Sequence, residues 1–158
     1  MKHNTPMRGA TITGYGTALP EKVLTNHDLA QMVDTTDEWI RDRTGIEERR
    51  IGGTTSGLGI EAAQKAMSMA GADPDDIDLV ILATTSPDDQ VPGSSPTIQH
   101  ELGLSCGALD VNAACSGFVY GLIAAHGFIG AGAKKVFVIG SDTPSRITNW
   151  TDRTKRIL

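Results

Sequence analysis

The chain has 158 residues, of which 39% are hydrophobic and 21% are charged, and this length suits one globular domain that buries about 70% of its unfolded surface. The formal net charge of −5 and the lack of a basic block argue against a nucleic-acid or anionic-membrane surface. No stretch approaches the roughly 20 apolar residues of a membrane span, and the polar N-terminus lacks the apolar core of a signal peptide, so a cytoplasmic protein is expected.

The first half of the chain predicts one strand followed by three helices. Residues 10–16 (ATITGYG) form the expected strand. A helix over 25–33 has Asn26 as its N-cap, and a helix over 35–45 begins at Thr36 and ends at Gly45. After a loop at 52–57, apolar residues at helical spacing predict a helix over 58–71. The acidic run at 72–78 could suggest a metal site, but a turn leading into the next strand explains it better.

The second half of the chain alternates strands and helices. Residues 79–85 (LVILATT) form a continuous apolar run that suits a buried parallel strand. A capped helix is expected over 92–103, with Ser95 before Pro96, and is followed by a strand at 107–114, a long helix at 115–133 and a buried strand at 134–142. This alternation predicts an α/β sheet with helices on both faces.

The expected helix over 115–133 is apolar around most of its circumference and rich in glycine. Each interior glycine costs roughly 0.8–1 kcal/mol relative to alanine, so other backbones must pack closely against this helix. The pattern predicts a helix at the centre of the molecule.

The two cysteines, Cys106 and Cys115, support neither a disulfide framework nor a zinc cluster, because no C-x-x-C pair is present. A free cysteine often acts as a small buried hydrophobe, and this interpretation is kept for Cys106. Cys115 differs because it lies where a strand gives way to a helix, a place where the helix dipole favours a thiolate. The same helix N-terminus could donate a backbone N–H to an oxyanion.

Several long segments of the chain resemble the N-terminal half of the β-ketoacyl-ACP synthase III family. They include TGYGTALPEKVLTN, TDEWIRDRTGIEERR, ATTSPDDQVPGSSPTIQ, ALDVNAACSGFVYGL and SDTPSRITNWTDRT, in the order that the family has them. The resemblance implies a thiolase-like fold, with this chain as one three-layer α/β/α half that has a mostly parallel, mixed five-stranded sheet. It implies a single half-domain over 1–158, with the C-terminal half absent from this chain.

The resemblance also implies functional residues. Cys115 resembles the nucleophile that takes an acyl group from acyl-CoA. Trp39 and Arg43 match residues that bracket the CoA adenine, Thr35 lies in the same patch, and Arg153 matches a basic contact to a CoA phosphate. An indole and a guanidinium stack well on a flat base, and residues 39 and 43 share one face of a helix. Without the resemblance, Trp39 would be interpreted as a core residue and the two arginines as surface charges.

Val91 matches a position that bounds the acyl pocket across the dimer interface of the family. A valine there would leave room for a longer or branched primer, although it could also serve packing alone. The implied substrates are acyl-CoA, with acetyl-CoA as the expected primer, and malonyl-ACP. The expected partners are acyl carrier protein and either a second copy or a C-terminal half. The resemblance implies no cofactor and no metal.

The family uses a Cys-His-Asn triad whose histidine and asparagine lie in the C-terminal half. His126 is the only histidine after Cys115, and eleven residues along a helix place it about 16 Å away, which is beyond hydrogen-bond reach. The remaining histidines and candidate asparagines match no family motif: His3, His27, His100, Asn112 and Asn149. The chain alone is therefore expected to be incomplete, with an apolar face of the 115–133 helix exposed.

Three hypotheses follow. The first is an acyltransferase of fatty-acid synthesis initiation that condenses acyl-CoA with malonyl-ACP through an acyl-cysteine, present here as a fragment or as one component of a split enzyme. The second is a non-catalytic half-length module for binding or dimerisation. The third is another thiolase-fold branch, such as a hydroxymethylglutaryl-CoA synthase or an alkylquinolone-type synthase, because primer choice can change within one fold.

Overall fold

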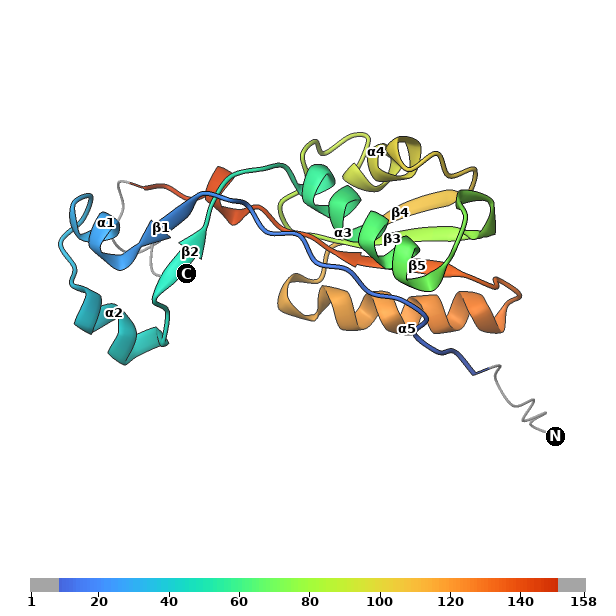
Figure 1. Ribbon diagram of the computed structural model, residues 1–158, viewed down its shortest axis with the longest axis horizontal. Helices are drawn as coiled ribbons and strands as arrows, with labels where there is room; N and C mark the ends of the chain where they lie inside the picture. Colours follow the sequence, from blue (N-terminus) through green and yellow to red (C-terminus); the bar gives the residue numbers. More distant parts are fainter. Residues whose placement is uncertain (1–8, 151–158) are drawn as a thin grey trace. The chain divides into compact units, whose positions relative to one another are not determined.

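The computed structural model describes residues 9–150, which form two compact units (Figure 1). We call the first the sheet unit; it comprises residues 9–18 and 54–142. We call the second the hairpin unit; it comprises residues 19–53 and 143–150. Within the described residues, no helix has both the length and the hydropathy that a membrane span requires.

A three-stranded parallel sheet lies at the centre of the sheet unit. In spatial order its strands are β4 (Gly107–Val111), β3 (Leu79–Ala83) and β5 (Val136–Gly140). In the central strand, Val80, Ile81 and Leu82 have no exposed surface. Burial on both faces confirms that the apolar run beginning at residue 79 is a buried parallel strand.

Helices cover both faces of this sheet. α3 (Thr55–Ala70) and α4 (Ser94–Glu101) lie on one face, and α5 (Gly117–Gly130) lies on the other (Figure 1). Two short 3₁₀ turns, η1 (Pro74–Asp76) and η2 (Ala114–Ser116), lead into β3 and α5. The main core consists of buried apolar side chains from the sheet, α3, α4 and neighbouring loops: Ala63, Ile77, Val80, Leu82, Ile98, Leu104 and Ile139. The three-layer α/β/α arrangement is confirmed.

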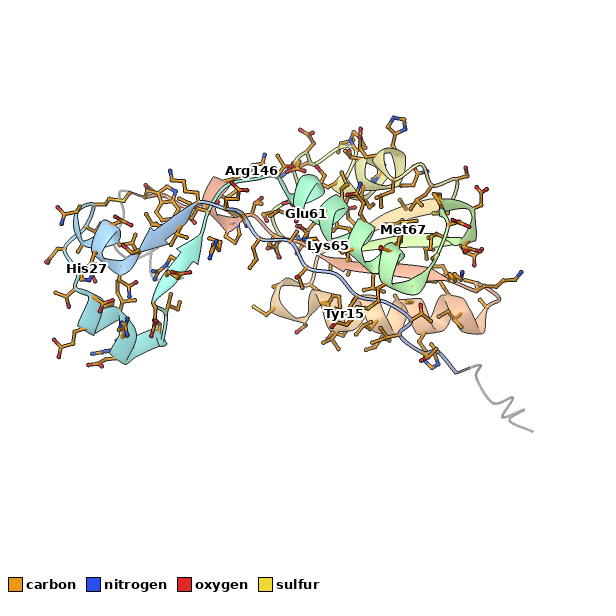
Figure 2. The ribbon with its side chains drawn as sticks, viewed as in Figure 1. Tyr15, His27, Glu61, Lys65, Met67 and Arg146 are labelled. Atoms are coloured by element: carbon orange, nitrogen blue, oxygen red, sulfur yellow. The ribbon has the colours of Figure 1, made fainter. Side chains whose placement is uncertain are left out.

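The prediction of a five-stranded mixed sheet is wrong for the described residues, because the segment at 10–16, expected as the first strand, pairs with no strand there. This segment runs against α3 instead. A Cβ added at Gly14 or Gly16 would collide with the carbonyl oxygens of Ala66 and Ala62, so glycine is required for this close approach. Lys65 on α3, which is ion-paired with Glu61, donates to the carbonyl of Thr17 (Figure 2). β-Branched residues predicted an extended backbone, but they could not identify what it would pack against.

The hairpin unit is built around a small antiparallel pair of strands, β1 (Val23–Thr25) and β2 (Glu48–Arg50), in which Val23 lies opposite Arg50. Two helices follow β1, α1 (Asn26–Ala30) and α2 (Asp37–Thr44), and a 3₁₀ turn, η3 (Pro144–Arg146), belongs to the same unit. Its core consists of buried Leu24, Leu29 and Ile40, against which Trp39 and Trp150 pack.

The structure confirms the caps predicted for α2 and corrects two others. Thr36 accepts a hydrogen bond from the Trp39 N–H, and Gly45 ends α2 with a φ of 70°. α1 is capped by Thr25 rather than Asn26, because the Asn26 side chain is buried and donates to Asp37 and to the carbonyl of Ile46. α4 starts at Ser94 after Gly93, so Ser95 lies inside the helix.

α5 is buried only on the side that faces the sheet, where its buried residues are Gly117, Gly121 and Ala125. Its other face is apolar and open; the exposed fractions are 47% for Phe118, 56% for Val119 and 61% for Ile123. The expectation of a helix buried on all sides is therefore met on one side only. Exposure of the other side agrees with the predicted exposed apolar face of the 115–133 helix.

Two glycines of α5 give a test of this packing. An added Cβ at Gly121 would lie 2.9 Å from Val138 Cγ1, whereas nothing lies within 4 Å of an added Cβ at Gly127. Alanine favours a helix over glycine by about 1 kcal/mol at either position. Overpacking costs about 1–3 kcal/mol, so we expect Gly121→Ala to lower the free energy of unfolding and Gly127→Ala to raise it. Urea melts of the two variants check this, and equal shifts would contradict the packing described here.

Candidate active site

Cys115 lies in η2, between the end of β4 at Val111 and the start of α5 at Gly117. The predicted strand-to-helix junction is confirmed, and the cysteine is exposed. The preceding Ala114 has a φ of 45°, a left-handed conformation that is strained for a residue with a Cβ. An added Cβ at Gly117 would lie 3.3 Å from the Cβ of Ala83, so α5 begins directly against the end of β3.

The first turn of α5 contains no acidic residue, and no side chain caps its N-terminus. The N–H groups of Ser116 and Gly117 are used within the turn, donating to the carbonyls of Ala113 and Ala114. Within residues 9–150, the Cys115 thiol has no hydrogen-bond partner. The junction therefore presents an exposed thiol at the positive end of a helix dipole, as a cysteine nucleophile requires.

Cys106 provides a contrast. It is half-buried and directly precedes β4, at the opposite end of the sheet from Cys115. Burial raises the pKa of the Cys106 thiol above its ordinary value, and the charge of Asp78 raises it further. The interpretation of Cys106 as a packing residue agrees with this environment, because burial disfavours the thiolate.

Asp142, two residues after the end of β5, accepts hydrogen bonds from several donors at the end of the sheet where Cys115 lies. Its Oδ1 accepts hydrogen bonds from the backbone N–H groups of Thr85 and Ser86 and from the hydroxyls of Thr84, Thr85 and Ser86, at 2.8–3.1 Å. Burial raises the pKa of Asp142, but these hydrogen bonds outweigh burial and hold the pKa below its ordinary value. Sequence reasoning missed this cluster, although three hydroxyl residues at the end of one predicted strand and an aspartate at the end of another were a visible signal.

A hollow of about 460 Å³ opens at the carboxyl ends of β3 and β4. Its lining is mixed, with Pro87, Pro96, Ala108 and Leu109 among the apolar residues and Thr84, Thr85, Asp89, Ser95, Asp110 and Asn112 among the polar ones. Asp110 also holds α4 in place, because it accepts the backbone N–H groups of Ser94 and Ser95 at 2.9 and 2.8 Å. Ligands of open α/β sheets bind at the carboxyl ends of the strands, so this hollow lies where a substrate would be expected.

The predicted CoA residues that the structure describes belong to the hairpin unit. Trp39 and Arg43 lie on α2, and the Cζ atom of Arg43 is 5.6 Å from the centre of the Trp39 ring. Trp39 is half-buried against the core of the hairpin unit, so it also has the packing role that was considered for it. The hydroxyl of Thr35 is buried and has no partner among the described residues. Arg153 lies outside the described residues.

The other predicted positions are scattered. Val91 is 90% exposed on the loop before α4. His100 lies in the last turn of α4, His126 is half-buried on α5, and His27 lies on α1 in the hairpin unit (Figure 2). His3 lies outside the described residues. Among residues 9–150, no group of three or more His, Cys, Asp or Glu side chains could hold a metal ion.

Comparison with known proteins finds similarity to one family. The sequence is 52% identical over 157 residues to a β-ketoacyl-[acyl-carrier-protein] synthase III of Thioalkalivibrio sulfidiphilus; the match covers 96% of this chain and 49% of that protein. A sequence model of the 3-oxoacyl-[acyl-carrier-protein] synthase III family matches residues 109–158, which include Cys115. The chain matches the N-terminal half of β-ketoacyl-[acyl-carrier-protein] synthase III.

Solved structures agree. The 3-oxoacyl-[acyl-carrier-protein] synthase III of Aquifex aeolicus superposes with a TM-score of 0.91 at 44% identity, over 95% of this chain and 50% of that one. The priming β-ketosynthase of the R1128 polyketide pathway superposes with a TM-score of 0.89 at 31% identity, over 96% of this chain and 47% of that one. The fold is thus the thiolase-like α/β fold of the synthase III structures, and the chain spans about half the length of the curated relatives it matches.

Proposed function

We propose that this chain supplies the nucleophile-bearing half of an acyltransferase that initiates fatty-acid synthesis by condensing acyl-CoA with malonyl-ACP. The observation that carries the proposal is Cys115, an exposed thiol at a strand-to-helix junction inside the segment that matches the synthase III family. The identity of about 50% to curated synthases III supports the same chemistry. The proposed primer is acetyl-CoA, and the proposed setting is the cytoplasm.

In the proposed first step, the Cys115 sulfur attacks the thioester carbonyl of acyl-CoA. The bond between the carbonyl carbon and the CoA sulfur breaks, CoA leaves as a thiol after taking up the proton, and an acyl-cysteine thioester remains. In the second step, malonyl-ACP loses carbon dioxide, its carbanion attacks the acyl-cysteine, and the cysteine thiolate is released. Neither step draws on a resident cofactor or metal, and the family resemblance assigns the histidine and asparagine of the second step to the other half.

CoA itself is proposed to contact the hairpin unit. Trp39 and Arg43 provide a flat ring and a planar cation on one face of α2, which suit an adenine, and Thr35 has a buried hydroxyl that lacks a partner among the described residues. Arg153 is proposed as the phosphate contact. Val91 is proposed to bound the acyl pocket across a dimer interface, where its side chain would leave room for a longer primer than acetyl.

The non-catalytic hypothesis has one observation in its favour, the exposed apolar face of α5. A face of this kind indicates association, either with a second copy or with a C-terminal half. One of the similar solved structures is a polyketide priming β-ketosynthase, which supports the alternative that this chain uses a primer other than acetyl-CoA. Both alternatives retain the fold and differ from the main proposal in whether, and with which acyl group, Cys115 reacts.

Intact-mass spectrometry of the purified chain after incubation with acetyl-CoA tests the proposal. We expect one added acetyl group on the wild type and on Cys106→Ser, and none on Cys115→Ser, because only Cys115 is exposed at the helix N-terminus. Propionyl-CoA and longer acyl-CoAs report the choice of primer. A wild-type chain that takes up no acyl group would favour the non-catalytic module, and a label that persists in Cys115→Ser would remove Cys115 from the reaction.

A further inference from the structure

We propose that Asp142 is a positioning residue for acyl transfer, which fixes the segment Thr84–Ser86 beside the Cys115 junction. This inference rests on the function proposed above. It starts from the unusual number of donors, five, that converge on a single carboxylate oxygen.

The five hydrogen bonds take the place of secondary structure. β3 ends at Ala83, and Thr84–Ser86 continues past it without helix or strand. Each of the three residues is tied to Asp142 through its hydroxyl, and Thr85 and Ser86 are tied through their N–H groups as well. Thr84 and Ser86 are only 5% and 4% exposed. The segment is therefore held in one conformation by a charge that lies 56–58 residues away in the sequence.

The fixed segment lies at the same end of the sheet as Cys115. The N–H of Thr84 donates to the carbonyl of Val111, the last residue of β4, and Cys115 follows four residues later. The first residue of α5, Gly117, packs against Ala83, the residue before Thr84. Thr84 and Thr85 also line the hollow at the carboxyl ends of β3 and β4. Movement of this segment would therefore disturb the end of β4 and the start of α5, the two elements between which Cys115 lies.

Asp142 could instead serve stability alone, and the sheet offers a matched control for that role. Asp78 stands at the opposite end, directly before β3, and its Oδ2 accepts the N–H groups of Lys134 and Lys135 at 2.6 and 3.0 Å. Both aspartates are exposed, both join the segment around β3 to that around β5, and hydrogen bonds hold the pKa of both below the ordinary value. Only Asp142 lies at the end of the sheet where Cys115 lies.

The experiment compares Asp142→Ala, Asp142→Asn and Asp78→Ala in the full chain. We measure the single-turnover rate of acetylation by acetyl-CoA, its dependence on acetyl-CoA concentration and the melting temperature. The rate of a reaction falls steeply when the reacting groups are misplaced. We therefore expect Asp142→Ala to lower the limiting acetylation rate about tenfold, with little change in the half-saturating concentration of acetyl-CoA. Asn keeps one acceptor oxygen, so Asp142→Asn should retain an intermediate rate even if the alanine variant fails to fold. Asp78→Ala should lose stability but not limiting rate.

The inference would be overturned if Asp142→Ala and Asp78→Ala lost the same fraction of the limiting acetylation rate. It would also be overturned if Asp142→Ala and Asp142→Asn both kept the wild-type rate. If the wild type takes up no acetyl group, the proposed function fails, and alkylation of Cys115 by iodoacetamide then decides the inference by itself. An alkylation rate altered by the two Asp142 variants and not by Asp78→Ala would support a role of Asp142 in shaping the surroundings of Cys115. Equal alkylation rates in all variants would exclude that role.

Discussion

Replacing Trp39 with alanine is expected to weaken CoA binding to this chain by roughly tenfold to a hundredfold, because base stacking on an aromatic ring contributes about 1–3 kcal/mol. The indole lies on α2, and the Arg43 guanidinium lies 5.6 Å from its centre. An adenine stacked against this pair would gain contacts with both the ring and the cation. Isothermal titration calorimetry with CoA measures the loss of affinity. The same titration with dephospho-CoA separates the contribution of the phosphate.

Three further variants separate stacking from folding. Trp39 also packs against the core of the hairpin unit, so Trp39→Phe keeps an aromatic ring there and should lose less affinity than alanine. Arg43→Ala removes an exposed side chain, and Arg50→Ala removes another exposed arginine of the same unit, whose partner is Glu48. Weaker CoA binding in Arg43→Ala with unchanged binding in Arg50→Ala supports the proposed site. Similar affinities in all four variants and the wild type would show that CoA binds elsewhere.

Local sequence patterns predicted several regular elements but missed β1 and β2, and α3 begins at Thr55, inside the segment predicted as a loop. The apolar run at 79–85 predicted β3, and Thr36 with Gly45 predicted the limits of α2, because strand burial and helix caps depend on residues close together in the chain. Residues 10–16 and Asn26 could not be predicted in the same way. Residues 10–16 pack against α3, more than 40 residues away in the sequence. The side chain of Asn26 is buried and donates to the carbonyl of Ile46, so tertiary contacts decided both outcomes.

The features of the candidate site also differ in whether the local sequence could predict them. Cys115 could be located because a strand, a cysteine and a helix follow one another in sequence, and Trp39 could be paired with Arg43 because residues four apart share a helix face. The Asp142 cluster and the hollow at the carboxyl ends of β3 and β4 were not predicted. Both features form only where residues at the ends of three strands meet at one end of the sheet, and local periodicity does not predict the order of the strands.

Replacing Asp110 with alanine is expected to lower the free energy of unfolding by about 2–3 kcal/mol, a substantial part of a typical domain's stability. Each of its carboxylate oxygens accepts one backbone N–H, from Ser94 and from Ser95, at the start of α4. Ser94 and Ser95 are 2% and 0% exposed, so water cannot readily replace the lost acceptor. The charge also interacts favourably with the helix N-terminus, and this contribution is lost with it.

Asp75→Ala is the matched control, because Asp75 is an exposed carboxylate of the same unit on η1 and the change in net charge is the same. Substitutions at such surface positions shift stability by about 0.5 kcal/mol or less. Asp110→Asn keeps one acceptor oxygen and should lose an intermediate amount. Urea melts followed by circular dichroism measure all three variants. If Asp110→Ala shifted the midpoint no more than Asp75→Ala, the two hydrogen bonds to α4 would contribute nothing. The start of α4, and with it one wall of the hollow at the carboxyl ends of β3 and β4, would then be held by apolar packing alone.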